Sequence, residues 1–332
     1  TILAASSNYL RVAADPNTAG KVVFAYSKGN QGAAKAGTVS GTSISLGSEA
    51  VFENAAMNYL SLAFDTLTPN RIAVAYRDDG NSDYGTCCVG VVSGLSISFG
   101  TPVVFLSSGT DHTAITFDSN LNKIVVAAMD DGSSGHGKAF VGTVSNTAIS
   151  FGSAVTYSTA STTSTGATFD LNSNKVVVAY NASSNGKARV GTVSGTSISY
   201  GSPVVFESAE VPIVSATFDS NSNKVVLAYK DAGNSNYGTA IVGTVSGTGI
   251  SFGSAVVFDS VASTGISATF DSSRNKITIA YPYGGASGNF IDGTVSGTSI
   301  SFTSPSVVFQ SGGEIYNLSS AFDASSAKTV VG

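Results

Sequence analysis

Residues 215–258 read SATFDSNSNKVVLAYKDAGNSNYGTAIVGTVSGTGISFGSAVVF, and this stretch decides the fold. It contains four short runs rich in Val, Ile, Thr, Phe and Tyr, which are typical of strands, separated by clusters of Gly, Asn, Asp and Ser, which are typical of turns. The run 224–229, Lys-Val-Val-Leu-Ala-Tyr, is almost continuously apolar, as expected for a strand buried on both faces. We therefore expect an antiparallel unit of four strands, named a to d in chain order.

The last two strands of this unit are predicted to be joined at Gly247-Thr248. A glycine at the first position of a two-residue loop indicates a type II′ hairpin turn. The same Gly-Thr loop stands within Ser-Gly-Thr-Ser at residues 40–43, 194–197 and 296–299. We expect strand d to run from Gly249 through Phe258 as the outermost strand.

The unit is copied in tandem along the whole chain. Gly-Thr-Val-Ser begins at Gly37, Gly142, Gly191, Gly243 and Gly293, and Gly90 begins an altered sixth copy, so the spacing is 49 to 53 residues. An aspartate closes strand a of every unit: Asp15, Asp65, Asp118, Asp170, Asp219, Asp271 and Asp323. Repeats of this length and composition must be interpreted as an array of one supersecondary unit.

An array of four-stranded antiparallel units with two apolar faces predicts an all-β fold, a β-propeller formed as a single domain over residues 1–332. The units begin near residues 4, 54, 107, 159, 208, 260 and 312, and the last is truncated in its second strand, so we expect seven blades with the seventh incomplete. Residues 1–3 align with the end of a strand d, so either the two ends complete one blade or the chain belongs to a longer tandem protein. A β-solenoid and an open superhelix of sheets are the alternatives; the hairpins argue against a solenoid.

The composition limits the function. The net charge is −5 and charged residues make up 11% of the chain, with Lys and Arg scattered singly, so the basic surface of a nucleic-acid-binding protein is absent. No run approaches 18 apolar residues, so we expect no membrane insertion. Cys87 and Cys88 are predicted to be buried thiols on opposite faces of a strand; a strained disulfide between them is the alternative.

Length variation between the copies is concentrated in the loop between strands b and c. From the basic residue that opens strand b to the following repeat glycine, the interval varies from 16 to 19 residues, while the other intervals are nearly constant. In a propeller the b–c and d–a loops share one face, and variable loops on a constant scaffold commonly carry binding residues. The candidate ligand-binding residues on this face are Asp78, Asp79, Asn81, Tyr84, Asp130, Asp131, Asp231, Asn234, Tyr237 and Tyr283. Their carboxylates, amides and rings suit a sugar, although ordinary turn chemistry explains the same residue types.

Metal and catalytic sites have weaker support. His112 and His136 belong to one unit and could approach Asp131 on the candidate face as a metal site. Asp118-x-Asn120-x-Asn122 resembles the start of a calcium loop, but Lys123 replaces the required glycine, so a hairpin capped by the aspartate is the simpler interpretation and no cofactor is expected. No nucleophile elbow or repeated glutamate pair is present, which argues against an enzyme.

Residues 174–180, NKVVVAY, and 190–208, VGTVSGTSISYGSPVVFES, resemble tandem repeats of large surface or virion-associated proteins of marine phages and microbes. The absence of Trp excludes the WD40 family. The resemblance implies an extracellular, cell-surface or virion protein with an attachment or display role, in a larger assembly or a longer chain. We therefore expect a non-enzymatic module that recognises a glycan or a surface protein through the b–c/d–a loop face. A purely structural fibre, tail or surface-layer domain is the first alternative, and a hydrolase or lyase on a propeller scaffold is the second.

Overall fold

The computed structural model describes residues 7–284, 287–303, 305–312, 315 and 318–332. Within them the chain forms strands and three short 3-10 turns. No helix in these residues is long and apolar enough to cross a membrane.

The strands follow the repeat, and each of the first six units contributes the same succession. The first three units contain β1 (Ser7–Ala14), β2 (Lys21–Lys28), β3 (Gln31–Ser40), β4 (Ser43–Leu46) and β5 (Ala50–Glu53); β6 (Met57–Phe64), β7 (Arg71–Asp78), β8 (Tyr84–Ser93) and β9 (Ser96–Phe99); then β10 (Val103–Asp118), β11 (Lys123–Asp130), β12 (His136–Ser145) and β13 (Ala148–Phe151). The next three contain β14 (Val155–Asp170), β15 (Lys175–Ala182), β16 (Asn185–Ser194), β17 (Ser197–Tyr200) and β18 (Val204–Glu207); β19 (Val214–Asp219), β20 (Lys224–Asp231), β21 (Tyr237–Ser246), β22 (Gly249–Phe252) and β23 (Val256–Ala262); then β24 (Ser267–Asp271), β25 (Lys276–Tyr283), β26 (Ser287–Ser296), β27 (Ser299–Phe302) and β28 (Val307–Ser311). The seventh unit contains β29 (Ser320–Asp323) and β30 (Lys328–Val331).

The all-β prediction and the antiparallel pairing are confirmed. In the fifth unit the order is β19-β20-β21-β22, and every neighbouring pair is antiparallel. β10 and β14 each run from the outer edge of one unit into the innermost strand of the next, so three successive units share one extended sheet. Among the residues that the structure describes, no sheet closes on itself.

Strand d differs from the prediction of one strand from Gly249 through Phe258. The structure divides it into β22 and β23, which pair with opposite ends of β21. The division falls at Gly253, where a Cβ atom would lie 1.9 Å from the backbone oxygen of Thr298 in the next unit. The chain therefore bends where the turn of the neighbouring unit touches its backbone.

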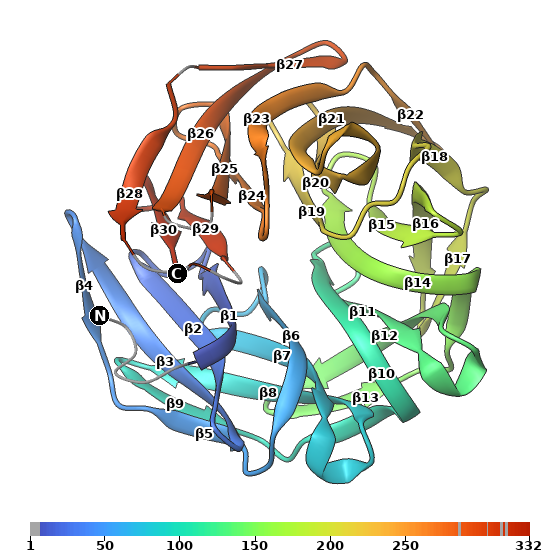
Figure 1. The fold of residues 1–332 in the computed structure, drawn as a ribbon. Helices are drawn as coiled ribbons and strands as arrows, with labels where there is room; N and C mark the ends of the chain where they lie inside the picture. The colour runs from blue at the N-terminus through green and yellow to red at the C-terminus, as the bar shows by residue number, and fades with distance from the viewer. Residues whose placement is uncertain (1–6, 285–286, 304, 313–314, 316–317) are drawn as a thin grey trace.

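The units follow one another around a central opening, and the first strand lies beside the last unit (Figure 1). The backbone N–H of Val12 in β1 donates to Ser319 Oγ at 3.0 Å, which joins the two ends of the ring. Similar bonds join neighbouring innermost strands elsewhere, such as that from the Ala268 N–H to Ser215 Oγ at 3.0 Å. The innermost strands thus carry polar links around the opening.

The apolar core is divided among the contacts between successive units, which we call seams. Between the fifth and sixth units, Val226 and Val242 pack with Ile277, Ile279 and Ile291, all buried. This arrangement explains why the second strand of each unit lacks alternation, because both of its faces are covered. The adjacent thiols fit the same arrangement: Cys88 faces the first seam and Cys87 the second, and both are buried and free.

The predicted hairpin turns are supported by backbone angles. Gly247 has φ +59°, and its counterparts Gly41, Gly195 and Gly297 have φ between +60° and +61°. Glycine adopts this conformation without steric cost. In the third unit Asn146 takes the same place at φ +55°, which suits the tolerance of asparagine for this region.

Candidate functional site

A cavity of about 220 Å³ lies at the centre of the ring, where the innermost strands begin. All seven units line it, and the side chains that matter below are Tyr9, Arg11, Tyr59 and His112. A second cavity of about 270 Å³ shares Arg11, Thr113 and Leu318 with the first and is lined deeper along the innermost strands. We call the first cavity the central pocket.

Three aromatic residues enter the central pocket from equivalent places in the first three units. Tyr9, Tyr59 and His112 have left-handed φ angles of +53°, +49° and +51°. Each lies where the pairing of the innermost strand with its neighbour is interrupted by a bulge. Bulges redirect side chains, and left-handed conformations of bulky residues cost energy and occur preferentially at functional sites.

The three rings form a continuous series. The centroids of Tyr9 and Tyr59 lie 5.7 Å apart, and those of Tyr59 and His112 lie 4.9 Å apart, with interplanar angles of 50° and 56°. Tilted contacts at such distances are favourable between aromatic rings. The series provides a fixed aromatic surface to a ligand in the pocket.

Arg77 contacts the Tyr59 ring of this aromatic surface and is itself bound by two carboxylates. Its Nε lies 2.8 Å from Asp79 Oδ1 and its Nη1 lies 2.6 Å from Asp111 Oδ1, while its guanidinium carbon lies 5.0 Å from the Tyr59 ring centroid. Asn58 Nδ2 donates to the other carboxylate oxygen of Asp79 at 2.5 Å. Burial opposes the charge on Arg77, but the hydrogen bonds to the two carboxylates outweigh it and raise its pKa. The network fixes the orientation of Tyr59 through a charged group that stays protonated.

Burial also decides the protonation of the rings. It lowers the pKa of His112 against the opposing charge of Asp111, and it raises the pKa values of Tyr9 and Tyr59. At neutral pH all three rings are therefore uncharged. Uncharged rings suit stacking against the C–H face of a neutral ligand better than binding of a small ion.

Arg11 is the charged residue that lines both central cavities. Its Nη1 donates to the Leu10 carbonyl at 2.9 Å, and within the described residues it makes no ion pair. Burial lowers its pKa, although a guanidinium keeps its proton at neutral pH. Its remaining donors can bind hydroxyl or carboxylate oxygens of a ligand.

Several of the predicted loop residues support turns. Asp78 and Asp231 are buried and accept backbone N–H groups of the following 3-10 turns, η1 (Asp79–Asn81) and η3 (Ala232–Asn234), at 2.9 to 3.1 Å. Asp130, before η2 (Asp131–Ser133), is buried against Lys138 Nζ and Ser108 Oγ, each at 2.5 Å. The carboxylates of Asp78 and Asp231 therefore hold the loop backbone, whereas that of Asp130 is paired with side chains.

The remaining predicted residues lie nearer the surface. Asn81, Asp131, Asn234 and Tyr283 are exposed, and Tyr84 and Tyr237 are partly exposed opposite the buried aspartates across their hairpins. Asp79 alone among the ten belongs to the network around Tyr59. The sequence interpretation missed Tyr9, Tyr59, Arg11 and Arg77. Asn8-Tyr9-Leu10 and Asn58-Tyr59-Leu60, repeated at one place in two units, were the signal that could have indicated them.

The hypothetical metal site is not assembled. In the parts of the chain that the structure describes, no group of three His, Cys, Asp or Glu side chains could hold a metal ion. His112 stacks on Tyr59, whereas His136 stands opposite Asp130 in the strand register. The calcium-like motif is a turn, because Asp118 Oδ1 accepts the backbone N–H groups of Asn120 and Leu121 at 2.9 and 3.0 Å.

The fold can be compared with known proteins. No protein-family model and no curated protein matches the sequence. Among solved structures, BP39L lectin from Burkholderia pseudomallei has a TM-score of 0.71 at 14% identity, covering 97% of this chain and 91% of the lectin. AofleA from Arthrobotrys oligospora has a TM-score of 0.58 at 10% identity, covering 92% and 88% of the two chains. A candidate 6-phosphogluconolactonase from Bacteroides uniformis has a TM-score of 0.64 at 10% identity, covering 91% and 86%. At these identities the likeness concerns the fold alone. It agrees with the all-β architecture of this chain.

Proposed function

We propose that this protein is a non-enzymatic carbohydrate-binding module that holds a glycan in its central pocket. The observation that carries the proposal is the series Tyr9, Tyr59 and His112, three rings at equivalent places with left-handed backbone and contacts of 4.9 to 5.7 Å. Aromatic rings with adjacent fixed polar groups are the usual means of orienting a small ligand in a pocket. Arg11 and the Arg77–Asp111 pair supply those polar groups.

We propose further that the ring is a seven-bladed β-propeller whose seventh blade is incomplete in this chain. The seven equivalent aspartates and the bond between Val12 and Ser319 support this architecture. The likeness to a lectin over 97% of the chain supports the carbohydrate ligand. An extracellular, cell-surface or virion location is part of the same proposal, and it rests on the low charge and on the repeats that the chain resembles.

A glycan array probed with the labelled protein tests the function. The expected result is binding to a restricted set of glycans that is lost in Tyr59→Ala and retained in Tyr237→Ala, because Tyr237 begins β21 outside the pocket lining. Equal binding by both variants would place the site elsewhere. If no glycan is bound by any form, the structural role remains as the alternative.

The likeness to a candidate lactonase gives a specific reason to test catalysis. Hydrolysis of sugar lactones, followed as acid release at constant pH, should not exceed the rate without protein. A rate that falls on substitution of His112, a ring at the pocket whose pKa burial lowers, would favour the enzyme instead.

A further inference from the structure

A groove of about 890 Å³ lies on the seam between the fifth and sixth units, and we call it the outer groove. Phe258 and Asp259 of β23 line one side of it, and Tyr281, Asn289 and Phe302 of the sixth unit line the other. Pockets for small ligands commonly measure about 300–1,000 Å³ and combine apolar walls with a few polar groups. The outer groove has both properties, and it shares none of its described lining residues with the central pocket.

The polar group of interest is a carboxylate at the end of the last strand. Three units carry one at this place, opposite a glycine of the third strand: Glu53, Glu207 and Asp259. In the first and fourth units both oxygens of the glutamate are bonded. One accepts a backbone N–H two residues further on at 3.1 or 3.2 Å, and the other accepts the hydroxyl of a tyrosine in the next unit, Tyr76 or Tyr229, at 2.9 or 3.2 Å. A glutamate at this place is therefore satisfied within the protein.

Asp259 keeps only the first of these two contacts. Its Oδ1 accepts the backbone N–H of Val261 at 3.3 Å, whereas its Oδ2 is buried and has no hydrogen-bond partner in the described part of the chain. The aspartate side chain is one methylene shorter than a glutamate, so it does not bond to Tyr281, which holds the place of Tyr76 and Tyr229. A buried carboxylate oxygen without a donor is costly, so a ligand that brings a donor would lower the free energy of the site.

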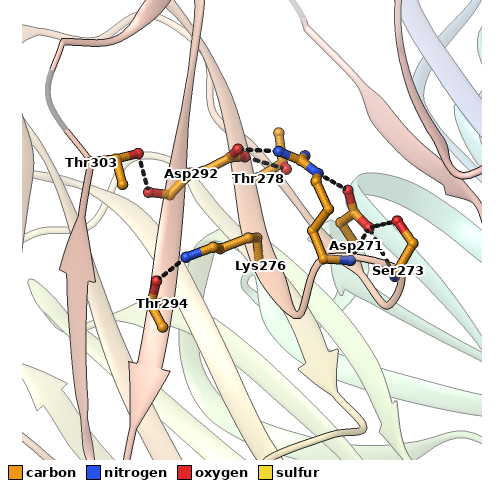
Figure 2. Close-up of polar contacts among 8 residues, drawn as sticks. Asp271, Ser273, Lys276, Thr278, Asp292, Thr294 and Thr303 are labelled. Atoms are coloured by element: carbon orange, nitrogen blue, oxygen red, sulfur yellow. Dashed lines mark hydrogen bonds and ion pairs between the residues drawn. The ribbon is translucent and has the colours of Figure 1, made fainter.

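Two other carboxylates of this region show how the chain pairs such groups with a cation. Asp271 and Asp292 lie 2.6 and 2.5 Å from Nε and Nη1 of Arg274 (Figure 2). Thr278 Oγ1 donates to Asp292 as well, at 2.7 Å. Both carboxylates are thus held by charged and neutral donors at once, which Asp259 is not.

The outer groove carries no positive charge of its own. Among its described lining residues there is no Lys, Arg or His. The third and fourth units place a lysine, Lys138 or Lys187, where the sixth unit has Asn289. Burial raises the pKa of Asp259, against the opposing effect of the Val261 N–H. A cation bound beside this carboxylate would stabilise its ionised form.

Aromatic rings stand beside the carboxylate. The ring centroid of Phe258 lies 5.3 Å from that of Tyr281 and 5.7 Å from that of Phe302. The faces of such rings attract cations, and their apolar surface suits a hydrocarbon group. A guanidinium prefers a carboxylate with both oxygens free for its planar fork, whereas Asp259 Oδ1 is already bonded to the backbone. A compact ammonium with three donors fits the remaining oxygen better.

We propose that the outer groove binds a primary ammonium group attached to an apolar body. The ammonium donates to Asp259, in the role that a tyrosine hydroxyl has for Glu53 and Glu207, and the apolar body packs on Phe258 and Tyr281. A free arylalkylamine and a lysine side chain of another polypeptide share this chemistry.

Isothermal titration of the whole chain measures binding of 2-phenylethylamine, with 2-phenylethanol as a neutral probe of similar shape. We expect saturable one-to-one binding of the amine and about 10-fold or more weaker binding of the alcohol, since a charge-assisted hydrogen bond is the stronger one. Nα-acetyl-lysine amide presents the same ammonium on a more polar body. Tighter binding of this probe would assign the ammonium to a lysine side chain, and tighter binding of 2-phenylethylamine would assign it to a free amine.

Three variants test the assignment to Asp259. Asp259→Asn keeps the shape of the side chain, removes its charge and should weaken amine binding about 10-fold or more. Asp259→Glu keeps the charge but restores the length with which Glu207 bonds to Tyr229, so Tyr281 should compete for the carboxylate and amine binding should weaken as well. The matched control Glu207→Gln changes the equivalent carboxylate of the fourth unit and should leave the amine affinity unchanged.

Thermal unfolding of each variant checks that the fold is intact; Asp259→Asn should keep the Tm of the wild type, because Oδ2 has no partner to lose in the described part of the chain. The proposal is wrong if the alcohol binds as tightly as the amine, if Asp259→Asn binds the amine as tightly as the wild type, or if no binding occurs at about 10 mM amine, a concentration that detects even weak complexes. Amine binding that is lost in Tyr59→Ala and kept in Asp259→Asn would place the amine in the central pocket and overturn the assignment.

Discussion

Tyr59 and His112 come from equivalent places in successive units, and their ring centroids lie 4.9 Å apart in the central pocket. Each residue is held at a left-handed φ by a bulge in its strand. Most other features of the repeat serve packing. Two bulky residues with a left-handed backbone therefore mark a place where these units differ from the common pattern of the repeat. The pocket therefore combines a constant frame with locally specialised side chains.

Removal of the Tyr59 ring should weaken ligand binding strongly. Tyr59→Ala deletes the contacts to both Tyr9 and His112, so we expect glycan affinity to fall about 10-fold or more, since ring contacts contribute roughly 0.5–1.5 kcal/mol each beyond their buried area. Isothermal titration with a glycan identified on the array measures the change. The control is Tyr84→Ala. Tyr84 follows η1 in the b–c hairpin of the second unit, and this variant should bind normally.

The same residue predicts an unusual stability comparison. Because Tyr59 has φ +49°, Tyr59→Gly should be more stable than Tyr59→Ala by about 1 kcal/mol, the opposite of the order at most strand residues. Urea unfolding monitored by fluorescence compares the two variants. If Tyr59→Ala proved more stable than Tyr59→Gly, residue 59 would not have a left-handed backbone.

Arg77 should act as a positioning residue for the pocket. Arg77→Met keeps the aliphatic stem but removes the hydrogen bonds to Asp79 and Asp111, so we expect weaker glycan binding with a normally folded ring. Arg77→Lys should not restore affinity, because a lysine ammonium cannot reproduce the planar fork that bridges two carboxylates. Unchanged glycan affinity of Arg77→Lys would show that a positive charge alone suffices at this position.

The partly buried His112 predicts a pH dependence. The pKa of His112 is lowered in the folded protein, mainly by burial, whereas an unfolded histidine titrates near about 6.5. The unfolded state therefore binds more protons, and the stability that depends on neutral His112 is complete above about pH 6.5 and declines as the pH falls below that value. Denaturant unfolding at pH 7.5 and 5.5 should show a smaller loss for His112→Phe than for the wild type. Equal losses in the two proteins would contradict the prediction.

The repeat made most of the fold predictable. The apolar run at 224–229 and the turn at Gly247 each depend on neighbours within one unit, and both were found as expected. The division of strand d at Gly253 was missed because its cause is Thr298 in the next unit, a contact that no local pattern encodes.

The candidate site was predictable only in outline. Loop length drew attention to Asp79, which pairs with Arg77 beside Tyr59, and equally to Asp78 and Asp231, which are buried turn caps. Tyr9 and Tyr59 lie in a strand sequence that looks apolar, and their exposure to the pocket arises from bulges that the pairing of two strands creates. Comparison of the copies could also have detected that Thr278 and Asp292 of the sixth unit stand where the fifth unit has Val226 and Val242.

The close contacts between units give the most direct test of the ring. At Gly201 a Cβ atom would lie 1.9 Å from the backbone oxygen of Thr248, so Gly201→Ala must push two units apart and should destabilise the protein by about 1–3 kcal/mol, as overpacking does. Gly249→Ala is the matched control, because its nearest atom, the oxygen of Ser246, lies at 3.5 Å. Thermal unfolding of both variants compares them directly. A Tm for Gly201→Ala as high as that of Gly249→Ala would mean that successive units do not touch at this turn.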